Sequence, residues 1–96
     1  MSDDRTLPAV TFSNFVISLA QSAMVHLGEA PDPATGRKLA PQLPVARHTI
    51  DVLGVLADKT KGNLDDEEQK LIDSVLFECR SKFVAASQAS EAAPQA

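Results

Sequence analysis

Three kinds of side chain in this sequence could do chemistry: two imidazoles, one thiol and an acidic run. His26, His48 and Cys79 fall in different segments. They therefore lack the paired spacing of a metal site and do not form a nucleophile–base pair along the chain. The run from Asp65 to Glu68 has the spacing of a capping box, in which its first carboxylate caps a helix and its last reaches back. The sequence thus predicts no catalytic residue, no metal and no cofactor, and we do not expect an enzyme.

Four basic residues would gather into an anion-binding patch if a long loop folded back towards the end of the second predicted helix. They are Arg37, Lys38, Lys59 and Lys61. Gly36 and Gly62 would let the backbone approach a ligand closely there. The plainer explanation is turn geometry with favourable positive charge at a helix C-terminus. A small ligand- or anion-binding domain, or a small enzyme, that uses the 28–43 loop and the Lys59–Asn63 turn stays open as an alternative.

Helical periodicity predicts three helices that would position these side chains. The first covers 12–27 and is capped by Thr11 or Ser13, with Gly28 beyond it in the left-handed conformation. The second covers 44–61 and starts at a proline, whose fixed φ suits a first helical turn. The third starts with the acidic run and ends at about Val84.

Each predicted helix has one apolar stripe that is expected in the core. The predicted core residues are Phe12, Phe15, Val16, Leu19, Ala20, Ala23 and Leu27 in the first helix, Val45, Ala46, Ile50, Leu53, Leu56 and Ala57 in the second, and Leu71, Ile72, Val75, Leu76, Cys79 and Phe83 in the third. On the opposite side of the second helix, Arg47 and Asp51 have the i, i+4 spacing of a weak surface ion pair.

The segment 28–43 shows no periodicity and is long for a loop in a compact helical domain. Its centre, Asp32–Gly36, has turn chemistry, because Asp holds the backbone, Pro fixes φ and Gly takes a left-handed position. We therefore predict an all-α fold, a small three-helix protomer over 11–86 with a long loop between its first two helices. Residues 1–10 and 87–96 have little apolar mass to bury and are expected to be flexible, disordered tails.

The first helix has an unusual composition, because no Asp, Glu, Lys or Arg occurs between Thr6 and Leu27. Two other helices of a small domain cover roughly one of its faces, so the other face is expected to meet a second subunit. The predicted interface residues are Phe12, Phe15, Val16, Ile17, Leu19, Met24, Val25 and Phe77. We expect a non-catalytic interaction or assembly module that forms a homo-oligomer, a dimer or a tetramer. A hetero-complex, in which the first helix docks on a different protein partner, stays open.

Composition narrows the class of partner and the compartment. A chain of 96 residues with a net charge of -4 repels phosphate backbones and anionic headgroups, so we expect neither a nucleic acid nor a membrane partner. The first predicted helix is too short and too rich in polar side chains to span a bilayer. The opening Ser2-Asp3-Asp4 is unlike a signal peptide, and a single cysteine suits a reducing compartment, so a cytoplasmic location is expected.

Several short runs together resemble a known bacterial family. They are Ser13-Asn14-Phe15-Val16, Ser18-Leu19-Ala20, Ala23-Met24, Leu27-Gly28-Glu29, Thr49-Ile50-Asp51-Val52-Leu53-Gly54, and Lys59-Thr60-Lys61-Gly62-Asn63-Leu64 with Glu67-Glu68. Between Val10 and Val84 the chain resembles the bacterial domain of unknown function family 1844. The resemblance implies a small cytoplasmic helical domain and assigns no catalytic or binding residue. The stretch 38–42 is longer than the family pattern suggests.

Overall fold

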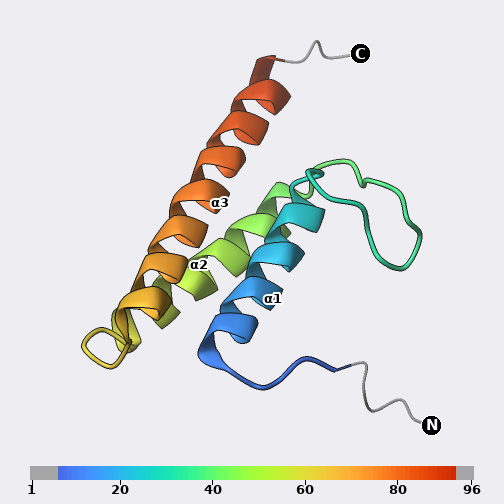
Figure 1. The fold of residues 1–96 in the computed structure, drawn as a ribbon. Helices are drawn as coiled ribbons and strands as arrows, with labels where there is room; N and C mark the ends of the chain where they lie inside the picture. The colour runs from blue at the N-terminus through green and yellow to red at the C-terminus, as the bar shows by residue number, and fades with distance from the viewer. Residues whose placement is uncertain (1–6, 93–96) are drawn as a thin grey trace, which may run out of the picture.

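The computed structural model describes residues 7–92, and these form three helices that run up, down and up (Figure 1). They are α1 (Phe12–His26), α2 (Leu43–Lys59) and α3 (Asp66–Ala92). Every pair of helices is in contact, so each helix has one side in a shared core and another side outside it. The predicted all-α, three-helix fold is confirmed. None of the helices in this part of the chain is both long and apolar enough to cross a membrane.

The predicted caps form at the starts of α1 and α3. The Thr11 hydroxyl accepts a hydrogen bond from the Asn14 amide at 3.0 Å, so Thr11 and not Ser13 caps α1. At α3 the Glu68 amide donates to Asp65 Oδ1 at 2.8 Å, and the Asp65 amide donates to Glu68 Oε1 at 2.9 Å. These reciprocal bonds satisfy amides that a helix start otherwise leaves without partners.

The second helix ends two residues earlier than predicted, at Lys59 instead of Lys61. Thr60 is the C-cap of α2, and its amide and hydroxyl both donate to the Leu56 carbonyl, at 3.1 and 2.8 Å. Gly62 then takes a left-handed φ of 89° and turns the chain towards α3.

The third helix is longer than predicted, because it continues past Val84 to Ala92. Residues 87–92, which the sequence analysis placed in a tail, are therefore helical. Their small side chains suggested a loose segment, but Ala, Gln and Glu are good helix formers and no Gly or Pro interrupts α3. Residues 1–6 and 93–96 of the predicted tails lie outside the described part of the chain.

The core lies where the three apolar stripes meet. Its buried members are Val16 and Ala23 from α1, Ile50 and Leu53 from α2, and Ile72, Leu76 and Cys79 from α3. Ala46 and Leu27 are buried as well. Two residues predicted for the core are not in it. Phe15 is 51% exposed because it lines the open groove between α1 and α2, and Val45 is 44% exposed in the first turn of α2.

The long loop between α1 and α2 is held by its own turn. Asp32 organises it, because its side chain accepts from the Ala34 amide at 3.0 Å and its carbonyl accepts from the Gly36 amide at 2.7 Å. The Asp32 amide donates in turn to the Arg37 carbonyl at 2.8 Å, and Gly36 has a φ of 74°. The predicted turn chemistry of Asp32–Gly36 is confirmed.

The ends of the same loop are fixed at the end of α1. The Gln42 amide donates to the His26 carbonyl at 2.7 Å. Gly28 has a φ of 80°, as predicted, and a Cβ there would lie 2.8 Å from the Leu39 carbonyl oxygen. Glu29, just after this glycine, forms an ion pair with Lys82 of α3 at 3.5 Å. The loop is thus a packed part of the domain.

Candidate functional site

The imidazoles and the thiol do not come together. Cys79 is 1% exposed within the core, and burial, with a smaller contribution from the charge of Glu78, raises the pKa of its thiol. His26 Nδ1 lies 2.9 Å from the Ser22 carbonyl oxygen, so that nitrogen is the donor of a helix-end hydrogen bond. His48 is exposed on α2. In residues 7–92 we find no group of three or more His, Cys, Asp or Glu side chains placed to hold a metal.

The four basic residues of the predicted patch lie at opposite ends of the molecule. Arg37 and Lys38 belong to the loop that joins the end of α1 to the start of α2, whereas Lys59 and Lys61 lie at the far end of α2 (Figure 1). A helix of 17 residues such as α2 separates its ends by about 25 Å. The loop therefore does not fold back towards the end of α2, and the structure does not assemble the predicted anion site.

The predicted interface on α1 divides into two separate flanks. Val16 is fully buried and contributes only to the core. Phe15 and Ile17 are 51% and 40% exposed. Residues that are two positions apart on a helix are separated by about 160° around its axis, so these side chains point to different sides. Phe12, Leu19, Met24 and Val25 are half-buried. The apolar residues of α1 thus do not form one continuous surface.

The flank with Ile17 is partly covered by the chain itself. Ile17, Met24 and Val25 line a groove of about 480 Å³ together with Ala30, Pro31 and Pro33 of the loop. The loop therefore shelters part of the side of α1 that the sequence analysis left for another subunit.

The flank with Phe15 opens onto an apolar groove that α1 shares with α2. This α1–α2 groove has a volume of about 500 Å³ and is lined by Phe15, His48, Asp51, Val52, Val55, Leu56 and Lys59. Val52 is 37% exposed and Val55 is 59% exposed, so with Phe15 they bring exposed apolar surface from two helices to one place. Such a local concentration of exposed apolar surface is typical of an interaction site.

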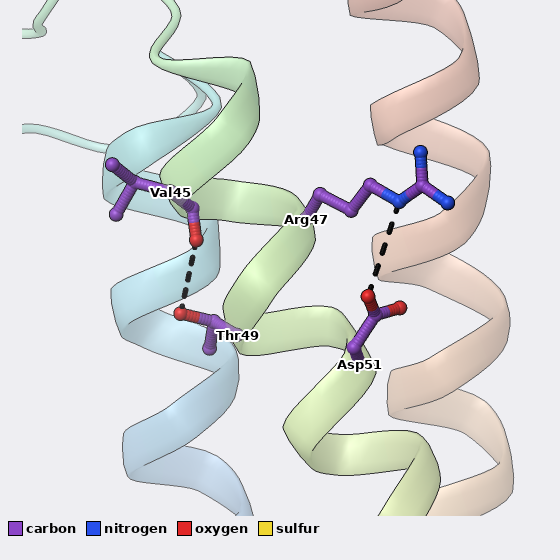
Figure 2. Close-up of polar contacts among 4 residues, drawn as sticks. All are labelled: Val45, Arg47, Thr49 and Asp51. Atoms are coloured by element: carbon purple, nitrogen blue, oxygen red, sulfur yellow. Dashed lines mark hydrogen bonds and ion pairs between the residues drawn. The ribbon is translucent and has the colours of Figure 1, made fainter.

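The two flanks of the outer side of α2 differ in charge. Figure 2 shows Val45 and Thr49 on the flank towards α1, and Arg47 and Asp51 on the flank towards α3. The Thr49 hydroxyl donates to the Val45 carbonyl at 3.4 Å, and Arg47 Nε lies 3.9 Å from Asp51 Oδ2. Both charged side chains are about 70% exposed, so the predicted ion pair forms but is weak.

A second groove, of about 500 Å³, lies between α2 and α3. Its charged lining residues are Asp51, Asp58, Lys61, Asp73 and Arg80. The guanidinium of Arg80 packs over Gly54, where an added Cβ would lie 3.2 Å from Nη2. The groove thus carries three carboxylates and two cations, a mixed charge.

Phe77 stands apart from both flanks of α1. It is 75% exposed on α3 and is separate from the α1–α2 groove. The structure therefore does not join it to the other predicted interface residues.

A family model described as "Domain of unknown function (DUF1844)" matches residues 9–85, which include all of α1 and α2 and most of α3. The chain belongs to this family. No curated protein and no solved structure matches it. The DUF1844 match covers the three-helix core and both grooves beside α1, and it assigns no function to them.

Sequence reasoning missed Val52 and Val55, which supply the α2 side of the groove in this DUF1844 domain. Both lie outside the predicted apolar stripe of α2, on a side taken as solvated because of Arg47 and Asp51. A signal was present, because two valines at i and i+3 form an apolar strip of their own on a helix.

Proposed function

We propose that this DUF1844 chain is a non-catalytic assembly module that self-associates through the α1–α2 groove. The observation that carries the proposal is the joint exposure of Phe15, Val52 and Val55 around one groove. The proposed interface differs from the one predicted from sequence, because α2 contributes six of the seven residues that line the groove and the flank with Ile17 is left out.

The free energy for such association comes from covering this apolar surface. Full burial of a Val or Phe side chain contributes about 1.5–3 kcal/mol, and roughly half of that is still available at Phe15 and Val55. In a two-fold dimer each contribution counts twice. A small domain gains stability in this way that its own core cannot supply.

The mixed charge on the rim of the groove supports a second copy of the chain as the occupant. The rim carries both signs of charge, Asp51 and Lys59, so a second copy brings a matching set. The thiol that could act as a nucleophile, Cys79, is in the core and out of reach of His48 on this rim. An interface therefore fits the groove better than a reaction site.

The test is the mass of the chain in solution, measured by sedimentation equilibrium from micromolar to submillimolar concentration. The wild type is expected to exceed one protomer mass, and Phe15→Asp and Val55→Asp are expected to remain monomeric. Ile17→Asp, on the other flank of α1, is the matched control and should associate like the wild type. Far-UV circular dichroism checks that each variant keeps its helices.

Two results would refute the proposal. One is a wild type that stays monomeric over the whole concentration range. The other is a folded Val55→Asp variant that associates as tightly as the wild type, since a buried, unpaired carboxylate is not tolerated in an interface core.

A further inference from the structure

The side chains along the outer ridge of α2 are arranged symmetrically about Val55. Asp51 lies four residues before it and Lys59 four residues after it, and all three line the α1–α2 groove. Residues four apart form one of the ridges by which helices pack against each other. The ridge therefore has an apolar centre, a negative end and a positive end.

We propose that two copies pair α2 against α2 in antiparallel orientation, with a two-fold axis at Val55. Asp51 of each copy then faces Lys59 of the other copy. This inference rests on the proposed self-association and specifies its register.

The argument for this register is the sign of the charges. A two-fold axis that passes Val55 brings the position four residues before it opposite the position four residues after it. In this chain these positions have opposite charges, so one dimer contains two attractive pairs. Parallel pairing of the same ridge would instead oppose Asp51 to Asp51 and Lys59 to Lys59, which is repulsive.

The packing geometry agrees with the charges. When ridges of this kind interdigitate, each ridge enters the groove beside its counterpart, which is the commonest way that helices cross in globular proteins. The α1–α2 groove borders this ridge on its α1 side. Val55 of one copy therefore meets Val55 of the other at the axis, and Val52 and Phe15 flank that contact.

The existing partner of Asp51 does not prevent this contact. Its ion pair with Arg47 is long, at 3.9 Å, and both side chains are about 70% exposed, so its carboxylate is free to share a second cation. Asp51 also lines both grooves of α2, which places it on the crest between them.

The first experiment exchanges the two charges and measures the dimer dissociation constant by sedimentation. Asp51→Lys alone and Lys59→Glu alone each create two like-charge contacts in a symmetric dimer, so each should weaken association about tenfold or more. The double variant D51K/K59E restores opposite charges in this register and should return to within about threefold of the wild type. Controls are Asp73→Lys and Lys70→Glu, which make the same charge changes on α3 and should have little effect.

The second experiment is oxidative cross-linking of Val55→Cys at low protein concentration. A residue on the two-fold axis meets its own copy, so a disulfide-linked dimer should form rapidly. The control is Phe77→Cys, which is more exposed but lies off the proposed interface and should cross-link slowly. The native Cys79 is buried and should not compete.

The two proposals can fail separately. In one outcome the wild type associates and Val55→Asp abolishes association, which keeps the groove as the interface. The register is nevertheless wrong if D51K/K59E associates no more tightly than the single variants and Val55→Cys cross-links no faster than Phe77→Cys. If the wild type is monomeric, both proposals fail. Recovery of dimerisation by the double charge exchange, together with selective cross-linking at position 55, would establish the register.

Discussion

Three glycines of this chain have left-handed backbones, and one of them should be much harder to replace than the others. Gly28, Gly36 and Gly62 have φ values of 80°, 74° and 89°. An added Cβ would meet nothing within 4 Å at Gly36 and Gly62, but at Gly28 it would lie 2.8 Å from the Leu39 carbonyl oxygen. Alanine substitution at the three positions therefore separates two contributions to the loss of stability, the left-handed backbone conformation and the close contact with the Leu39 carbonyl oxygen.

An alanine in the left-handed conformation lowers the free energy of unfolding by about 1–2 kcal/mol. The lower conformational entropy of the unfolded alanine variant offsets about 0.4–1 kcal/mol of this loss. Gly36→Ala and Gly62→Ala should thus each destabilise the domain by about 1 kcal/mol. At Gly28 the loop must also move, although the bond between the Gln42 amide and the His26 carbonyl, at 2.7 Å, ties it to α1. The loss of such a bond adds about 1 kcal/mol or more, so Gly28→Ala should cost about 2–3 kcal/mol.

The assay is urea unfolding followed by far-UV circular dichroism, at one fixed protein concentration because association adds to apparent stability. With a slope near 1 kcal/mol/M, the midpoint should fall by about 1 M for the two open glycines and by about 2–3 M for Gly28. Equal shifts at all three positions would show that the close approach of Leu39 has no energetic consequence. No shift at Gly28 would show that its backbone is not left-handed in solution.

Further predictions concern the core, the helix cap and the thiol. Leu53→Ala should lower the free energy of unfolding by about 2–5 kcal/mol because Leu53 is fully buried, whereas Val55→Ala should change protomer stability by under about 1 kcal/mol when measured by urea unfolding of the monomer. Asp65→Ala and Glu68→Ala should each lower the free energy of unfolding by about 0.5–2 kcal/mol, since each removes a side chain that accepts from the other residue's amide; no loss at either position would contradict the capping box. Because burial raises the pKa of Cys79, the folded state favours the neutral thiol, so stability should fall as the pH rises above about 8.5, and Cys79→Ala should remove that slope.

The fold was largely predictable from sequence because its signals are local. A cap such as Thr11 or the pair Asp65 and Glu68 acts within one helical turn, and Gly28 and Gly36 take the left-handed conformations that their type allows. The end of α3 was not predicted, because small residues such as those of 87–92 suit both a helix and a flexible segment.

The site was harder to predict because it depends on how neighbouring elements cover each flank of a helix. The apolar residues of α1 suggested one interface. A sequence does not show that loop residues such as Pro31 and Pro33 share a groove with Met24 and Val25 while the flank of Phe15 stays open. The charge pattern about Val55, in contrast, is fully visible in the sequence. This charge pattern did not indicate an interface while that side of α2 was taken as solvated, since opposite charges eight residues apart are common on a solvent-exposed helix face. The exposure of Val55 beside Phe15 links the pattern to the proposed self-association, because a second copy that covered Val55 would also meet the charges on either side of it.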